Sequence, residues 1–169
     1  MNSQLVITII TDDRPGVVEK VAGIINSHQG NWLESALSRL GGKFTGILLA
    51  DVPSEHHQSL KDDLQALSGG GIRATIDNAG SHASQGDEVT FEVIGNDRRG
   101  IVGEISHVLA KHGISVDELY TSTESAPMSG ELLFRASASV IIPPAMQKDE
   151  LRDILEQLSD DLMVEFFED

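Results

Sequence analysis

The stretch that decides the fold is Asp-Asp-Arg-Pro-Gly-Val-Val at residues 12–18, which recurs as Asn-Asp-Arg-Arg-Gly-Ile-Val at residues 96–102. A shift of 84 positions (97 − 13) aligns Asp with Asp, Arg with Arg and Gly with Gly. A strand-like run precedes each copy, at residues 5–10 and 89–94, and a run with helical apolar spacing follows each. The chain therefore repeats a unit of strand, turn and amphipathic helix, and an internal repeat predicts two domains of one fold. The apolar positions of the two expected helical faces are Val17, Val18, Val21, Ile24 and Ile25, and Ile101, Val102, Ile105, Val108 and Leu109.

The remaining elements follow the same order in both copies. Each expected helix is followed by two strands joined as a hairpin, a second helix and a last strand. This order predicts the α+β ferredoxin-like fold, βαββαβ, with an antiparallel sheet and both helices on one face. In the first copy the expected strands and helix after residue 30 are 31–40, 44–52, 55–67 and 72–76, and in the second copy the expected elements are 100–112, 114–123, 132–142, 147–160 and 163–167.

The predicted domains are residues 1–77 and 88–169, joined by a small, polar linker at 78–87. We align Gly30 with Gly113 as the glycines that end the first helices, which requires one extra residue, Gln29, in the first copy. Domains of this size bury little surface alone. We therefore expect the two units to share an interface, and the chain to be able to form a homodimer.

Composition excludes several classes of function. The 169 residues include 27 acidic and 12 basic side chains, which give a formal charge of −15. A field of this sign repels phosphate backbones, so no direct nucleic-acid contact is expected. The chain has no cysteine, no recognisable signal peptide and no apolar run long enough to span a membrane. We expect a cytoplasmic protein that does not bind membranes.

The repeated turn aims the start of a helix at whatever lies in front of it. The first N–H groups of a helix lack internal partners and carry partial positive charge, which suits a carboxylate. Gly16 and Gly100 would let a ligand approach the backbone, and Asp13 and Asp97 could accept an ammonium group. These groups together would hold a free amino acid. The structural alternative is that Asp13 and Asp97 only cap the helices, and that the arginines pair with acidic neighbours or face solvent.

The other candidate residues give no sign of catalysis. Adjacent His56 and His57 point to different sides of a helix, which is not metal-ligand spacing. His28 and His112 end the two first helices, where a favourable interaction with the helix dipole is the simplest role. The sequence contains no nucleophile elbow and no phosphate-binding loop. We expect no metal, no cofactor and no catalytic residue.

The turn Asp-Arg-Pro-Gly-Val-Val, placed after a strand and opening a helix, resembles the ACT domain, a small βαββαβ regulatory module. The strings at 118–123 and 126–130 in the second copy resemble the glycine cleavage system transcriptional repressor group of double-ACT proteins. The resemblance implies amino-acid-responsive regulation through protein contacts, with ligands at the turns and at interfaces between units. Arg99 replaces the usual proline of the second turn. The ligand-binding residues that the resemblance implies are Asp13, Arg14, Gly16 and Val17, and Asn96, Asp97, Arg98, Gly100 and Ile101.

Three functions follow from these expectations. The first is a non-enzymatic regulator that binds an amino acid, with glycine as one candidate, and acts on a transcription factor. The second is an amino-acid sensor that controls a metabolic enzyme. The third, an acyl-phosphate hydrolase, rests on fold analogy with Arg14 after the first strand, which is a weak argument.

Overall fold

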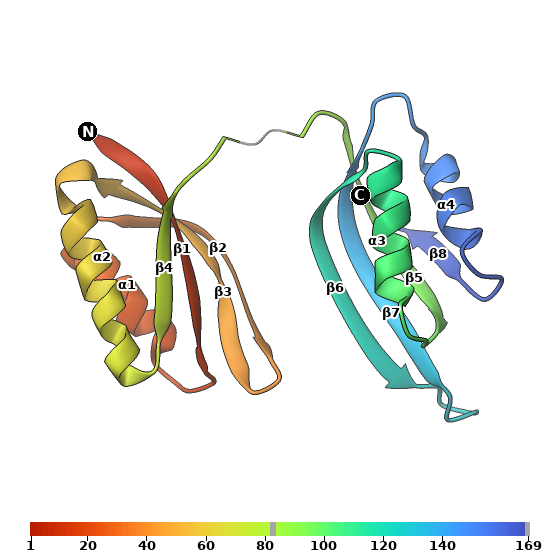
Figure 1. Cartoon of the computed structure of the whole chain (residues 1–169), viewed down its shortest axis with the longest axis horizontal. Helices are drawn as coiled ribbons and strands as arrows, with labels where there is room; N and C mark the ends of the chain where they lie inside the picture. Colours follow the sequence, from red (N-terminus) through yellow and green to blue (C-terminus); the bar gives the residue numbers. More distant parts are fainter. Residues whose placement is uncertain (82–83, 168–169) are drawn as a thin grey trace. The chain divides into compact units, whose positions relative to one another are not determined.

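The computed structural model describes residues 1–81 and 84–167, and the chain divides into two compact units, Met1–Ser81 and His82–Asp169 (Figure 1). The predicted linker, 78–87, includes residues 82 and 83, which lie outside the described residues, as do residues 168 and 169 of the predicted second domain. Both ends of that linker belong to strands, because one strand ends at Asn78 and the next begins at Asp87.

The first unit is a four-stranded antiparallel sheet in the order β2-β3-β1-β4, with two helices packed on it. Short 3₁₀ turns flank the second helix. The Gly41-Gly42 turn joins β2 to β3, with positive φ at both glycines, as a tight hairpin requires. The elements are β1 (Asn2–Asp12), α1 (Val17–Ser27), β2 (Asn31–Leu40), β3 (Lys43–Pro53), η1 (Ser54–His56), α2 (His57–Ala66), η2 (Leu67–Gly70) and β4 (Arg73–Asn78).

The second unit repeats this topology, with its sheet in the order β6-β7-β5-β8. The fold predicted from the repeat, two ferredoxin-like βαββαβ units, is confirmed. The last helix is shorter than expected, because the chain after Glu156 forms turns instead of continuing the helix. The elements are β5 (Asp87–Asn96), α3 (Ile101–Lys111), β6 (Ser115–Ser125), β7 (Leu132–Ile142), α4 (Lys148–Glu156) and β8 (Met163–Phe166).

Each core lies between the helices and one face of the sheet. In β1, alternate residues from Leu5 to Thr11 are buried, as expected for a strand with one covered face. Val17, Val21 and Ile25 of α1 are buried in the same core, whereas Val18 is 43% exposed. The apolar stripe is therefore narrower than the sequence predicted. The equivalent stripe of α3 is Ile101, Ile105 and Leu109, with Val102 exposed at its edge.

The alignment of Gly30 with Gly113 is wrong. The backbone N–H of Gly30 donates to Ile25, and that of Ile114 donates to Leu109, so the shift of 84 continues past the helix without an extra residue. Gln29 is the true counterpart of Gly113, and both have positive φ, 58° and 70°. Gly30 has a different role, since a Cβ there would lie 2.8 Å from the Ile25 side chain.

Within the described ranges, no helix is both long and apolar enough to cross a membrane.

Candidate functional site

The two repeated turns have nearly identical backbones. Gly16 precedes α1 with φ 87° and ψ 2°, and Gly100 precedes α3 with φ 85° and ψ −1°. This left-handed conformation favours glycine. Among the described residues no side chain caps either helix. The alternative that Asp13 and Asp97 are helix caps is therefore wrong, and within residues 1–81 and 84–167 the first N–H groups of α1 and α3 have no capping side chain.

Asp13 is held beside the β2–β3 hairpin. Its carboxylate lies 3.1 Å from Arg39 Nε, and its backbone N–H donates to the Gly42 carbonyl at 3.1 Å. The neighbouring Asp12 carboxylate pairs with Lys43, whose hydrogen bond and charge hold the pKa of Asp12 below its ordinary value. An ammonium group that binds Asp13 would therefore compete with, or share, the Arg39 contact. At the second turn, the Asp97 backbone N–H donates to the Leu132 carbonyl at 2.9 Å.

The two arginines of the turns have different partners. Arg14 is exposed and donates from Nη2 to the Gly70 carbonyl, so of the two expectations for the arginines, an acidic neighbour or solvent, exposure is the one that holds at Arg14. Arg98 forms a bidentate pair with Glu104, which lies in the first turn of α3. Its Nη1 and Nη2 donate to Oε1 and Oε2 of Glu104 at 2.7 and 2.6 Å. This pair raises the pKa of Arg98 and lowers the pKa of Glu104. The second arginine is thus engaged by an internal carboxylate.

Val17 and Ile101 can contact a ligand only through their backbone groups. Their side chains are buried in the cores, with 4% and 3% exposed. At Gly16, an added Cβ would have no neighbour within 4 Å in the described part of the chain, whereas at Gly100 it would lie 3.9 Å from Glu104 Oε1. The space in front of the Gly16 Cα is therefore more open than the space in front of the Gly100 Cα.

A further carboxylate lies beside the second turn, and sequence reasoning missed it. Asp161 Oδ2 accepts the backbone N–H of Asn96 at 2.7 Å, and its other oxygen accepts the Ser159 hydroxyl. These hydrogen bonds hold the pKa of Asp161 below its ordinary value. Asp161 is 65 residues from Asn96 in sequence, so only the pairing of β8 with β5 brings the two together.

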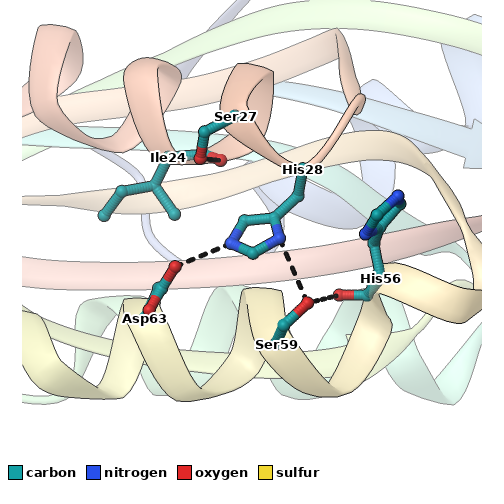
Figure 2. Close-up of polar contacts among 6 residues, drawn as sticks. All are labelled: Ile24, Ser27, His28, His56, Ser59 and Asp63. Atoms are coloured by element: carbon teal, nitrogen blue, oxygen red, sulfur yellow. Dashed lines mark hydrogen bonds and ion pairs between the residues drawn. The ribbon is translucent and has the colours of Figure 1, made fainter.

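A second polar cluster, also unforeseen, joins α1 to α2 in the first unit. His28 Nε2 lies 2.7 Å from Asp63 Oδ2, and His28 Nδ1 lies 3.2 Å from Ser59 Oγ (Figure 2). Ser59 also donates to the His56 carbonyl at 3.0 Å, within its own helical turn. The Asp–His–Ser order resembles a hydrolytic triad, but the serine hydroxyl is shared with a backbone carbonyl. The clearest role of the cluster of His28, Ser59 and Asp63 is to connect the end of α1 to α2. The spacing of Ser59 and Asp63, four residues apart on one helical face, is the signal that could have revealed this cluster.

Throughout residues 1–81 and 84–167, no group of three or more His, Asp or Glu side chains has a geometry that could hold a metal ion.

Comparisons with known proteins agree with this architecture. Residues 3–69 match the family model of the ACT domain. Curated relatives described as UPF0237 proteins, from Methanosarcina mazei and Methanosarcina acetivorans, are 33% identical over 55 residues, which is 32% of this chain. The chain spans 60% of the length of these relatives.

Among the solved structures that match, two cover at least 99% of this chain. An unknown protein from Galdieria sulphuraria has a TM-score of 0.84 and 26% identity, with 99% of this chain and 100% of that chain covered. A "putative glycine cleavage system transcriptional repressor" has a TM-score of 0.74 and 19% identity, with 100% and 99% covered. The second likeness establishes a shared fold. The ACT match covers most of the first unit, and the second unit repeats the same βαββαβ order.

Proposed function

We propose that this protein is a non-enzymatic regulator that binds a free amino acid at its strand–helix turns and transmits this state through contact with another protein. ACT domains are regulatory modules, and this chain carries two units of that fold. The observation that carries the proposal is the pair of repeated turns, in which Gly16 and Gly100 open helices that no side chain of the described residues caps. Uncapped helix N–H groups favour a carboxylate.

The first turn is the stronger candidate for the ligand. The N–H groups of Gly16 and Val17 would take the amino acid's carboxylate, and Asp13 would take its ammonium. Asp13 is 36% exposed at its side chain, so a ligand can reach it. At the second turn, which comprises Asn96, Asp97, Arg98, Gly100 and Ile101, Arg98 is engaged by Glu104 and Asn96 by Asp161.

A transcription factor is the proposed protein partner, in the manner of a glycine cleavage system repressor, with glycine as the first ligand to test. The net charge of −15 supports action through a protein and not through direct contact with DNA. The alternative is that the partner is a metabolic enzyme whose activity responds to the amino acid. Both readings share the ligand turns and differ only in the partner. Both alternatives imply a cytoplasmic protein. Light scattering of the purified chain tests whether it forms a homodimer.

The test has two parts. Calorimetric titration of the full chain against each of the twenty amino acids should reveal saturable binding of at least one. Capture of proteins from a lysate, with and without that amino acid, should then recover a partner whose binding depends on the ligand. Absence of binding by every amino acid would refute the proposal. Hydrolysis of an acyl phosphate by the purified chain would support an enzyme instead.

A further inference from the structure

Beside the second turn, hydrogen-bond donors surround an anionic group, and that group is the carboxylate of Asp161. It accepts one backbone N–H, from Asn96 at 2.7 Å, and one hydroxyl, from Ser159. The positive charge of Arg98 makes a smaller contribution in the same direction, and together these groups lower the pKa of Asp161. The molecule thus holds an internal carboxylate next to the end of β5.

Strand register identifies the matching position in the first unit. Met163 of β8 pairs with Ile94 of β5, and Arg73 of β4 pairs with Ile10 of β1. Ile10 is the counterpart of Ile94, since the two are 84 residues apart (94 − 10). Arg73 is therefore the counterpart of Met163, and the residue two positions before it, Gly71, is the counterpart of Asp161. The same shift relates Asp12 to Asn96, Thr11 to Gly95 and Arg14 to Arg98. The first unit keeps the backbone N–H and the arginine but has no side chain where the second has a carboxylate.

Arg14 lies close to this position. A Cβ built on Gly71 would be 3.9 Å from Arg14 Nη2 and 4.0 Å from Arg14 Nη1. A carboxylate that extends from there would be within reach of the guanidinium. Arg14 is exposed and donates to the Gly70 carbonyl, so it can turn toward a ligand without leaving a buried charge behind.

Thr11 is the counterpart of Gly95, which lies beside Asp161 in the second unit. In the second unit, a Cβ on Gly95 would lie 3.4 Å from Asp161 Oδ2. Thr11 has its Cβ at that position in the first unit, and its side chain is buried, with 3% of the residue exposed. Its Oγ1 is a buried polar atom for which no hydrogen-bond partner exists among the described residues. Buried hydroxyl groups normally have partners, so this one calls for an explanation.

We propose that the first unit has a binding position for a small free carboxylate, formed by the Thr11 hydroxyl, the Asp12 N–H, Arg14 and the side-chain-free Gly71. The ligand's carboxylate occupies the place that Asp161 fills in the second unit. Arg14 exchanges its neutral carbonyl partner for an anion, which forms a stronger, charge-assisted hydrogen bond. The two turns are therefore not equivalent, because the second is occupied by the protein's own carboxylate. This site goes beyond the proposed function, which places a ligand at the helix end.

Acetate is the probe, since it carries the carboxylate and nothing else that could bind. Sodium acetate replaces sodium chloride at constant ionic strength, and nitrogen-edited NMR spectra of the full chain follow the Asp12 amide and the Arg14 Nε–H. Both signals should shift saturably, whereas those of Asn96 and Arg98 should not. Absence of a saturable shift at Asp12 and Arg14 would overturn the proposal.

Gly71→Asp is the decisive variant, because it places in the first unit the carboxylate that the second unit has. Asp is among the residues that tolerate the left-handed conformation of Gly71, φ 85°. The Asp12 amide should shift without acetate and then fail to respond to it. A Gly71→Asp protein that is folded and still binds acetate with the affinity of the parent would exclude the site.

Arg14→Gln provides a second variant that leaves the backbone of the turn unchanged. Loss of a charge-assisted hydrogen bond should weaken acetate binding by about tenfold or more. If Arg14→Gln binds acetate as the parent does, the assignment is wrong. A separate glycine titration followed through the Val17 and Val18 amides reports on the helix end, so the two proposals can fail independently.

Discussion

The His28 imidazole lies 2.7 Å from the Asp63 carboxylate, and this contact connects the end of α1 to α2 in the first unit. His28 is largely buried, with 11% of its side chain exposed, whereas the Asp63 side chain is 60% exposed. The second ring nitrogen faces Ser59, so both nitrogens have a partner. The corresponding His112 of the second unit contacts only the Val108 carbonyl of its own helix, at 2.9 Å, among the described hydrogen bonds.

We predict that His28→Gln destabilises the first unit more than His112→Gln destabilises the second. The lost contact spans two helices and is partly buried, and a hydrogen bond of this kind contributes about 1 kcal/mol after allowance for solvent at Asp63. Hydrogen exchange of the α1 and α2 amides measures the effect on this unit alone. Equal losses of protection in the two units would show that the contact with Asp63 adds nothing.

The hydrogen bonds of Asp161 predict how the stability of the second unit depends on pH. The folded-state pKa is lowered from its ordinary value of 3.8, first by Ser159 and then by the Asn96 N–H. The stabilisation is therefore fully present above the unfolded-state pKa and is lost as the pH falls through the lower, folded-state pKa. Asp161→Asn should be less stable than the parent at neutral pH, and the difference should shrink below about pH 3.8.

Denaturant unfolding at a series of pH values, followed through β5 amides, measures this difference. Asp160→Asn is the matched control, because it removes the adjacent charge and leaves the contacts of Asp161 with Ser159 and Asn96 in place. A constant difference between Asp161→Asn and the parent across the acid range would contradict the prediction.

Local sequence signals were enough to predict the fold, because strand alternation, helical spacing and glycine turns are all properties of neighbouring residues. The turns at Gly16 and Gly100 follow directly from the repeat. The hydrogen-bond partners of the residues in those turns do not follow from the repeat. Arg14 contacts a carbonyl 56 residues away, and the Asp161–Asn96 contact spans 65 residues. Such contacts depend on strand register and loop path, and one sequence does not encode them in a short pattern.

The proposed amino-acid site predicts different effects for substitutions of the two partners in the Asp13–Arg39 ion pair. Asp13→Asn removes the charge that an ammonium group needs, so affinity should fall by about ten- to a hundredfold, as expected for a charge-assisted hydrogen bond. Arg39→Gln keeps that carboxylate and removes its present partner, 3.1 Å away, so affinity should stay the same or rise. Both side chains are exposed, and an exposed ion pair contributes little to stability.

Calorimetry with the amino acid that binds the parent measures both affinities, and thermal unfolding checks that the variants fold. Asp97→Asn reports on the second turn and should have the smaller effect, because Arg98 and Asn96 there already have internal acidic partners. If Asp13→Asn binds as tightly as the parent, the ammonium group does not contact this carboxylate and the ligand lies elsewhere.

The backbone conformation of Gln29 predicts that a glycine there would stabilise the first unit. The sequence analysis had placed the helix-ending glycine one residue later, at Gly30. Gln29 has φ 58°, in the left-handed region that disfavours residues with a Cβ, and its counterpart in the second unit is Gly113. Gln29→Gly should therefore stabilise the first unit, by up to about 1 kcal/mol, since relief of backbone strain is partly offset by the entropy of glycine in the unfolded chain. Gly113→Gln should destabilise the second unit by a similar amount.

Gly30→Ala separates this explanation from the alignment that made Gly30 the helix-ending residue. A Cβ at Gly30 would lie 2.8 Å from Ile25 Cγ2 and 3.1 Å from Val52 Cγ2, so the expected loss comes from crowding in the core, about 1–3 kcal/mol. Denaturant unfolding of the three variants, followed through amides of each unit, tests both roles. The assignment requires a gain for Gln29→Gly together with a loss for Gly30→Ala. A loss for Gln29→Gly would mean that the glutamine side chain contributes more than its backbone strain removes.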